Sequence, residues 1–367
     1  MSRFDAERWI YRKAVRPVLF GIDPEVIHDR MTDVAEFFGR TAPTRALTRA
    51  FFRYDNPALR QTIAGVDFTN PVGLSAGFDK NARLTQVMAD IGFGFEEIGS
   101  MSIRPCAGNP KPRLQRLPES KSVLVNYGLM NDGAEVIAAR LSKARSGLPL
   151  GISLVPTNDA GATTIPAMVE EVAAAHRILA PHAAYITLNL SCPNACQPQP
   201  FMSPVALREL LPEIVKLPNQ RPIFLKISPD VPFGQLDELM AVAAEHKVTG
   251  FIATNLTKQR EGNSALHNTD LPEKGGLSGK VVSELADRSL EHLARQSAGR
   301  FVLMGVGGIF SAEDAYRKIG LGASLLQLIT GMLYEGPGLI GSINHGLVER
   351  LVRDGFKNIS DAVGKDL

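Results

Sequence analysis

The sequence predicts an α/β fold, a (β/α)8 TIM barrel that follows an N-terminal amphipathic helical extension. From Asn70 onward, short apolar runs recur that are nearly continuous, as in the strands of a buried parallel sheet. Helical patterns separate most of these runs, and eight such units fill about 290 residues, the length of a (β/α)8 barrel. A doubly wound open sheet is the alternative, but that fold usually carries a glycine fingerprint after its first strand.

Composition excludes several classes of protein. The chain has 367 residues, 44% hydrophobic and 21% charged, which is typical of a globular protein. The net charge of +2 carries no electrostatic signature of nucleic-acid binding. Three cysteines are too few for a disulfide framework and favour a reducing compartment. Because no apolar run reaches about 18 residues and the start lacks a secretion signal, we expect a cytoplasmic protein whose membrane contact is peripheral.

The first predicted unit covers residues 1–60 and is helical, and the barrel domain covers residues 61–367. The triplet Asp-Pro-Glu at 23–25 is typical of a helix start with Asp as the N-cap, and apolar residues at helical spacing continue to Gly39. An earlier short helix carries a second apolar stripe, which Pro17 kinks or ends. Apolar stripes usually pack on a core, so a helical cap on the barrel and a membrane-facing helical hairpin are both open.

The barrel strands are expected in the apolar runs. These are residues 72–74, 95–99, 151–154, 185–190, 223–227, 250–253, 301–306 and 324–329. Two long connections interrupt the pattern, at 101–122, which is rich in proline and basic residues, and at 256–277, which is polar. In a barrel both lie at the C-terminal face, where loops carry function.

Glycine-rich turns follow the last two predicted strands. Gly307 and Gly308 come after the seventh strand, and Thr330 and Gly331 come after the eighth. Loops at these places in a barrel commonly hold a phosphate group through backbone N–H groups. Tight turns without a ligand are the alternative.

Lys226 lies in the predicted fifth strand, between Leu225 and Ile227. An unpaired ammonium is too costly to bury among such neighbours, so the side chain either points into the barrel mouth toward an anionic or electron-rich ligand or reaches solvent at the strand end.

Polar side chains gather where the fourth predicted strand ends, at Asn189, Ser191, Cys192 and Asn194. Such a concentration at the carboxyl end of a barrel strand indicates a site. Cys192 is a candidate nucleophile or base, and an inert buried thiol is the alternative. A metal pair with Cys196 lacks further ligands, so no metal site is expected.

Asn126 and Asn255 also follow apolar runs, and asparagines at several strand ends are expected to converge on one pocket. The seven histidines sit mostly in predicted helices or surface loops and are expected to be solvent-exposed.

Together, these residues resemble the dihydroorotate dehydrogenase family over nearly the whole chain. The matching motifs are NPVGLSAGFDKN (70–81), FGFEEIGS (93–100), GNPKPRLQRLPE (108–119), NLSCPN (189–194), LKISPD (225–230), GGLSG (275–279), MGVGGI (304–309) and YEGPG (334–338). The helical start, including LFGIDPE at 19–25, is similar to that of the membrane-associated, quinone-reducing class.

The resemblance implies an FMN-binding barrel that oxidises dihydroorotate to orotate in pyrimidine synthesis. In the family, a base removes a proton from substrate C5, and hydride passes from C6 to flavin N5. The quinone-reducing class then passes the electrons to a quinone, which implies peripheral association with the inner (cytoplasmic) membrane. The oligomeric state stays open.

The matching motifs also imply residue roles. Cys192 would be the base, and Lys226 would stabilise negative charge on the isoalloxazine ring. The substrate would contact Lys80, Asn126, Asn189, Asn194 and Asn255. The FMN would contact Ala76, Gly77, Lys80, Ser100, Asn126, Asn189, Lys226, Thr254, Ser278, Gly279, Gly307, Gly308, Ile329 and Thr330.

Some positions depart from the family pattern. Cys192 stands where the quinone class usually has Ser, Ser153 stands where that class has Asn, and residues 195–204 match neither family version. A related FMN barrel oxidoreductase acting on another dihydropyrimidine or an enone-like substrate is therefore a second hypothesis. A flavin-binding homologue without turnover is a third.

Overall fold

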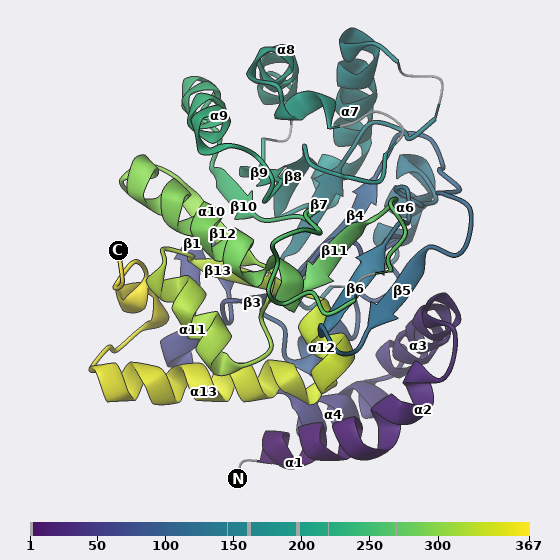
Figure 1. The fold of residues 1–367 in the computed structure, drawn as a ribbon, viewed down its shortest axis with the longest axis vertical. Coiled ribbons are helices and arrows are strands. Elements are labelled where there is room, and N and C mark those ends of the chain that lie inside the picture. The colour runs from purple at the N-terminus through teal and green to yellow at the C-terminus, as the bar shows by residue number, and fades with distance from the viewer. Residues whose placement is uncertain (1–2, 145, 160–162, 196–198, 219, 269) are drawn as a thin grey trace.

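The computed structural model describes residues 3–144, 146–159, 163–195, 199–218, 220–268 and 270–367. Its centre is a closed barrel of parallel strands (Figure 1). In order around the barrel these are β3 (Val72–Leu74), β4 (Phe95–Met101), β7 (Leu150–Leu154), β8 (Tyr185–Asn189), β9 (Ile223–Ile227), β10 (Gly250–Ala253), β12 (Val302–Val306) and β13 (Leu325–Leu328). All eight predicted strands and the TIM barrel are confirmed. The open-sheet alternative is wrong, because β13 pairs with β3.

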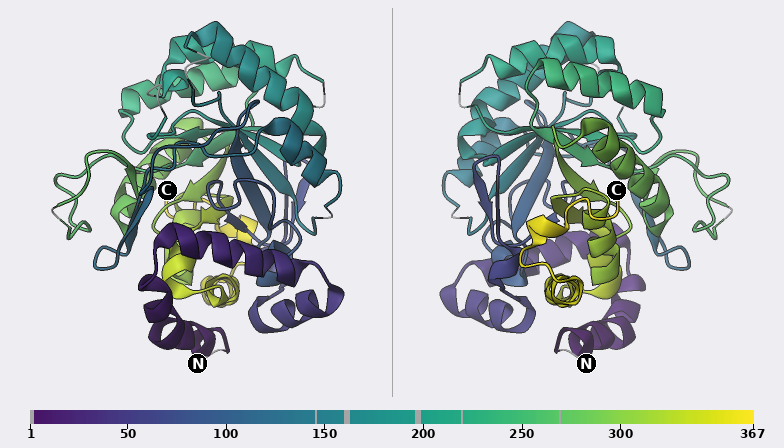
Figure 2. Two further views of the ribbon diagram at one scale, coloured as in Figure 1. Left: turned by 90° about the vertical axis from the view of Figure 1, so that its right-hand side faces the viewer. Right: turned by 90° about the vertical axis from the view of Figure 1, so that its left-hand side faces the viewer.

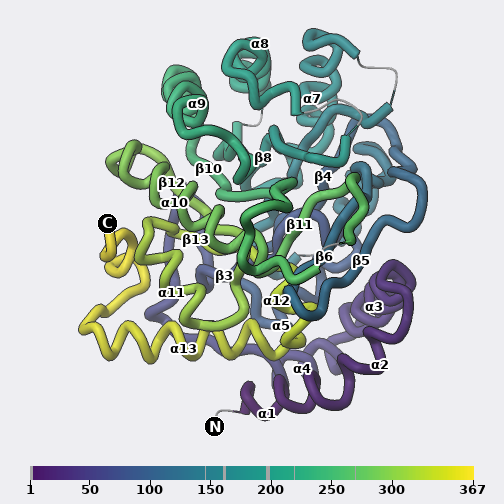
Figure 3. The backbone as a smooth tube through the Cα atoms, viewed as in Figure 1, coloured from purple at the N-terminus to yellow at the C-terminus, as the bar shows by residue number. Residues whose placement is uncertain are grey.

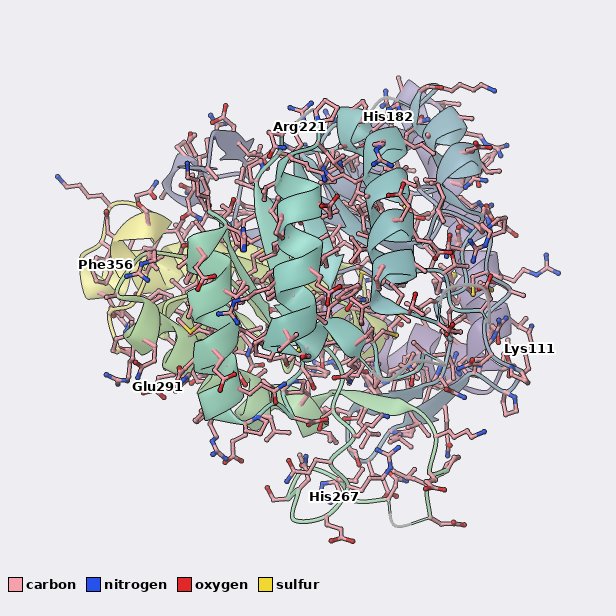
Figure 4. The ribbon with its side chains drawn as sticks, turned by 90° about the horizontal axis from the view of Figure 1, so that it is seen from above. Lys111, His182, Arg221, His267, Glu291 and Phe356 are labelled. Carbon is pink, nitrogen blue, oxygen red and sulfur yellow. The ribbon has the colours of Figure 1, made fainter. Side chains whose placement is uncertain are left out.

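Helices cover the outside of the barrel. They are α5 (Met88–Ile91), α6 (Ala134–Leu141), α7 (Ile165–Leu179), α8 (Pro204–Val215), α9 (Phe233–Glu245), α10 (Ser283–Ser297), α11 (Ala312–Gly320), α12 (Thr330–Glu335) and α13 (Gly338–Asp354). Figure 4 shows part of this layer from above, with neighbouring helices side by side. These helices bury an apolar face; in α8 it consists of Leu207, Leu210, Leu211 and Ile214.

One end of the barrel interior is filled with apolar side chains. The cluster consists of Phe68, Phe95, Tyr185, Phe224, Ile252, Met304 and Leu325. Phe68 comes from the hairpin of β1 (Gln61–Ile63) and β2 (Val66–Phe68), and Phe95 and Tyr185 begin their strands. The polar residues therefore lie at the opposite end, where the strands finish.

The two long connections contain strands that the sequence reading missed. β5 (Leu114–Leu117), β6 (Ser122–Val125) and β11 (Gly276–Gly279) form a three-stranded antiparallel sheet in the order β11-β6-β5. Figure 3 shows this sheet in front of the barrel, and β5 contacts α3. These strands have only four residues each, and their apolar side chains form two small clusters outside the barrel core, one of which includes Phe310, Tyr334 and Phe20, so they leave no long apolar run.

The N-terminal extension is a chain of helices rather than a simple hairpin. It consists of α1 (Arg3–Ile10), a π-helical turn (Tyr11–Val15), α2 (Arg16–Phe20), α3 (Pro24–Gly39) and α4 (Ala42–Phe52). The predicted helix start is confirmed, because the Asp23 carboxylate accepts hydrogen bonds from the N–H groups of Glu25 and Val26. Pro17 lies in α2 directly after the π-helical turn, and because residues 3–20 form one unbroken helical run, it does not end the helix.

The extension lies against α13 and the barrel (Figure 2), and several of its large apolar side chains are exposed. Trp9, Ile10, Val18, Phe37, Leu47 and Phe51 are each more than half exposed. None of the helices in the described ranges is long and apolar enough to cross a membrane.

Candidate active site

A cavity of about 390 Å³ lies at the carboxyl ends of the barrel strands. Its walls include nearly all the residues that the family resemblance selects. They are Ala76, Gly77, Lys80, Ser100, Asn189, Cys192, Asn194, Lys226, Thr254, Asn255, Ser278, Gly279, Gly307, Gly308, Ile329 and Thr330. Asn126 is the exception, since it does not line the cavity. Its Oδ1 accepts a hydrogen bond from Asn109 Nδ2 (2.9 Å), which also donates to the backbone oxygen of Asn194 (3.1 Å).

Lys226 points into the barrel rather than to solvent. It is 4% exposed, and its Nζ donates a hydrogen bond to Ser75 Oγ at 3.0 Å. The same Nζ lies 3.5 Å from Glu97 Oε1, whose side chain is fully buried. The buried Lys226 side chain therefore has a carboxylate partner at the base of the cavity.

Sequence reasoning missed Glu97. Its Oε2 accepts hydrogen bonds from Tyr185 OH (3.2 Å), Thr187 Oγ1 (2.9 Å) and Gln327 Nε2 (2.8 Å). The donors come from two other barrel strands, which fixes the carboxylate beneath Lys226. The available signal was the carboxylate pair in FEEIGS, because a charged residue inside an otherwise apolar barrel strand needs a partner.

A chain of amides and hydroxyls lines the neighbouring wall. Asn255 Nδ2 donates to Asn189 Oδ1 (3.2 Å), and Asn189 Nδ2 donates to Ser100 Oγ (2.8 Å). The Ser100 hydroxyl in turn lies 2.8 Å from the hydroxyl of Ser153. These contacts bring the ends of β4, β7 and β8 and the loop after β10 together. The wall can both donate to and accept from a planar ring with imide edges.

Cys192 follows β8 and opens onto the same cavity. Burial raises the pKa of its thiol to about 11, and backbone hydrogen bonds from Asn194 and Ala195 only partly offset this. The thiol is therefore largely protonated at neutral pH, and its thiolate is a strong base. Cys196, the other half of the excluded metal pair, lies outside the described residues.

Asn194 offers the cavity a hydrogen-bond acceptor that is unpaired in the part of the chain that the structure describes. Its Nδ2 donates to the backbone oxygen of Val125 at 2.9 Å, which fixes the orientation of the amide. Its Oδ1 is buried and has no hydrogen-bond partner among the described residues. A buried acceptor without a donor is costly, so a ligand N–H would satisfy it.

The opposite end of the cavity is built from backbone. Gly308 (φ +73°) packs so closely on Ser283 that a Cβ there would lie 2.2 Å from its Oγ. A Cβ on Gly279 (φ +82°) would likewise clash with the backbone oxygen of Lys121. Between these turns, the hydroxyls of Ser278 and Thr330 lie 2.9 Å apart. Backbone and hydroxyl groups in so tight a turn form a cradle for a phosphate-sized anion.

The expectation of solvent-exposed histidines is wrong for six of the seven, because only His267 is exposed. His176 is buried in α7, where burial lowers its pKa to about 4. His28 is half-buried on α3, lines the cavity, and lies with its Nε2 3.3 Å from Lys80 Nζ. In the structure, both residues lie on helix faces that pack toward the rest of the protein, because positions on one face of a helix recur every three to four residues.

The cavity continues between the N-terminal helices and the barrel. Its walls there are mostly apolar, with Leu19 and Phe20 from α2, Ile27 and Met31 from α3, and Leu333 from α12. The site thus joins a polar half inside the barrel mouth to an apolar half beneath the helical extension.

Comparison with known proteins agrees with this geometry. A family model described as dihydroorotate dehydrogenase matches residues 58–351. A dihydroorotate dehydrogenase (quinone) of Roseiflexus castenholzii is 39% identical over 358 residues, which cover 96% of each chain. One of Gloeobacter violaceus is 36% identical over 356 residues, which cover 97% of this chain and 98% of the relative. The crystal structure of an Eimeria tenella DHODH in complex with ferulenol superposes with a TM-score of 0.81 at 26% identity, covering 95% of this chain and 98% of that one. The chain belongs to the dihydroorotate dehydrogenase family.

Proposed function

We propose that this protein is a flavin-dependent dihydroorotate dehydrogenase that forms orotate for pyrimidine biosynthesis and passes the electrons to a quinone. The observation that carries the proposal is the convergence of Cys192, Lys226, Asn189 and Asn255 on one cavity that continues into an apolar passage. The quinone-type relatives, which match along nearly their full length, support the same activity.

The residues fit FMN as the flavin. The turns at Gly279 and Gly308, with the hydroxyls of Ser278 and Thr330, suit its phosphate, and the polar wall at Ser100 suits the edge of its ring. The chemistry that FMN supplies when bound is acceptance of a hydride from substrate C6 and its release as two electrons. Lys226 places its buried charge where negative charge develops, which stabilises the reduced form.

Cys192 is proposed as the base that takes the C5 proton of dihydroorotate. The amides of Asn189, Asn194 and Asn255 orient the ring, since amides pair with imide donors and acceptors alike. The Lys80 ammonium, buried in the same wall, suits the substrate carboxylate. Asn126 supports this wall indirectly, through Asn109 and the backbone of Asn194.

The apolar half of the cavity is proposed as the quinone site. Its walls include Leu19, Ile27 and Met31 of the helical extension, and the outer surface of that extension exposes Trp9 and Phe37. We therefore propose that the extension rests on the inner (cytoplasmic) membrane, where a quinone dissolved in lipid reaches the passage directly.

The electron acceptor is tested by reoxidation. After anaerobic reduction by dihydroorotate, a short-chain quinone is expected to restore the oxidised flavin spectrum rapidly, whereas fumarate does not. Mass spectrometry of the flavin released by heat is expected to identify FMN. Rapid reoxidation by fumarate alone would contradict a quinone acceptor without affecting the first half-reaction.

A further inference from the structure

We propose that His28 of the helical extension is a positioning residue for Lys80, holding the Lys80 ammonium where it meets the carboxylate of the substrate. The inference rests on the proposed function and adds to it a contact that links the extension to the substrate half of the site. The link is the 3.3 Å separation between His28 Nε2 and Lys80 Nζ.

Lys80 is a cation in unusual surroundings. It is 8% exposed, and no carboxylate among the described residues lies within ion-pair distance of its Nζ. Instead, Nζ lies 3.9 Å from the centre of the Tyr127 ring, a cation–π contact, and within hydrogen-bond reach of His28. Neither partner carries a negative charge. An ammonium held in this way retains a donor for an anionic ligand entering the cavity.

His28 is suited to accept this hydrogen bond. Burial, together with the charges of Lys80 and Arg83, lowers its pKa to about 3, so the imidazole is neutral at any assay pH. A neutral imidazole that accepts at Nε2 carries its proton on Nδ1. The ring also packs edge-on against Phe78, with centroids 5.0 Å apart. The acceptor is therefore held in one orientation.

The helix that carries His28 is itself fastened to the barrel side on both flanks. Upstream, Glu25 pairs with Arg113 of the loop before β5. Downstream, Glu36 Oε2 accepts from Arg83 Nε at 2.8 Å. Arg83 lies three residues after Lys80. The contacts His28–Lys80 and Glu36–Arg83 therefore join α3 to the loop that carries Lys80 at two points. A shift of α3, such as one caused by a ligand in the apolar passage, would be transmitted to Lys80.

The test compares acceptor-free and acceptor-bearing side chains at position 28. His28→Leu keeps much of the ring volume but removes the acceptor, and His28→Gln restores an acceptor oxygen near the position of Nε2. Thr32→Val is the matched control. Thr32 Oγ1 donates to the backbone oxygen of His28 at 2.8 Å, but Thr32 does not line the cavity. Each FMN-loaded protein is titrated with orotate by calorimetry, and anaerobic flavin reduction by dihydroorotate is then measured.

We expect His28→Leu to weaken orotate binding by about tenfold, which is ~1.4 kcal/mol. The dihydroorotate concentration for half-maximal flavin reduction should rise equally, while the rate at saturation changes less than about threefold. His28→Gln should bind orotate within about threefold of the parent, and Thr32→Val should match it. If His28→Leu does not fold, His28→Ala takes its place, and the comparison with His28→Gln stands.

Parental orotate affinity in His28→Leu would overturn the proposal, as would equal weakening in His28→Leu and His28→Gln, since the acceptor would then have no role. If the parent itself binds no orotate and is not reduced by dihydroorotate, the proposed function fails instead, and this control distinguishes the two failures.

Discussion

Lys226 Nζ lies 3.5 Å from Glu97 Oε1 inside the barrel, and both side chains are almost completely withdrawn from solvent. The pair joins β9 to β4 across the barrel interior, at the base of the cavity. The Lys226 end of the pair places an ammonium group at the base of the cavity, where low dielectric strengthens its interaction with a ligand. Each of the two buried side chains depends on the other, so the loss of either one is expected to destabilise the fold.

Removing one member of this pair should destabilise the fold. We expect Lys226→Met to lower the free energy of unfolding by about 3–5 kcal/mol, because Glu97 is left as a buried, uncompensated charge. Urea unfolding monitored by circular dichroism measures the loss. The double substitution Lys226→Met with Glu97→Gln should recover most of the stability but not the flavin reduction. A single variant as stable as the parent would show that the pair is not coupled.

Cys192→Ala should retain FMN but lose flavin reduction by dihydroorotate, because no group remains to take the C5 proton. General-base catalysis typically contributes a factor of ~10²–10⁴, so the rate should fall by at least about a hundredfold. Cys192→Ser should keep some activity. Stopped-flow absorbance under anaerobic conditions measures each rate. Reduction of the Ala variant at the parental rate would refute the assignment.

The pH dependence of flavin reduction follows from the pKa of the Cys192 thiol. Burial raises that pKa to about 11, so the active thiolate becomes roughly tenfold more abundant with each pH unit from 7 to 9. The reduction rate should rise accordingly. Burial also lowers the pKa of Lys80 to about 8, so substrate must be kept saturating as Lys80 loses its charge. A rate that stays flat across this range would argue against a thiolate base.

Glu96 is a second buried carboxyl, and it predicts a pH-dependent stability. Burial raises its pKa well above the usual value, and the nearby charge of Asp79 adds to the effect. The folded protein therefore holds a proton that the unfolded chain releases above about pH 4.3, so stability falls as pH rises past that value. Glu96→Gln cannot titrate. It should be more stable than the parent at pH 8, and the difference should shrink toward pH 4.5.

The exposed apolar surface of the extension should determine vesicle binding. Replacing Trp9 and Phe37, which are 54% and 57% exposed, with Glu should reduce cosedimentation with phospholipid vesicles by at least about tenfold. Flavin reduction by dihydroorotate should not change, because neither side chain lines the cavity. Binding equal to that of the parent would place the membrane contact elsewhere.

Much of this architecture is readable from sequence, for physical reasons. The barrel strands are buried on both faces, so each leaves an apolar run such as the one at Ile223–Ile227. Motif order selected sixteen residues that line one cavity, whereas Asn126 does not line it and accepts a hydrogen bond from Asn109 instead. Conversely, β5 has only four residues, of which one is exposed and one fully buried, and a pattern this short is not detected by a periodicity argument.

Contacts between distant segments were beyond sequence reasoning. His28 and Lys80 are 52 residues apart, and the histidine looks like any polar residue on an amphipathic helix. The Glu97 network gathers Tyr185, Thr187 and Gln327 from β8 and β13, which are not adjacent to β4 in the sheet and whose side chains meet it only inside the closed barrel. Contacts of this kind leave no signature in the local sequence, because each residue's role depends on a partner that the fold brings close.

The most direct test of the account is a visible spectrum recorded before and after dihydroorotate is added to the purified protein without oxygen. We predict a flavin spectrum that bleaches, with orotate formed in a one-to-one ratio to flavin. A flavin spectrum that does not change would contradict dihydroorotate oxidation and leave a flavin-binding barrel with a different substrate or none.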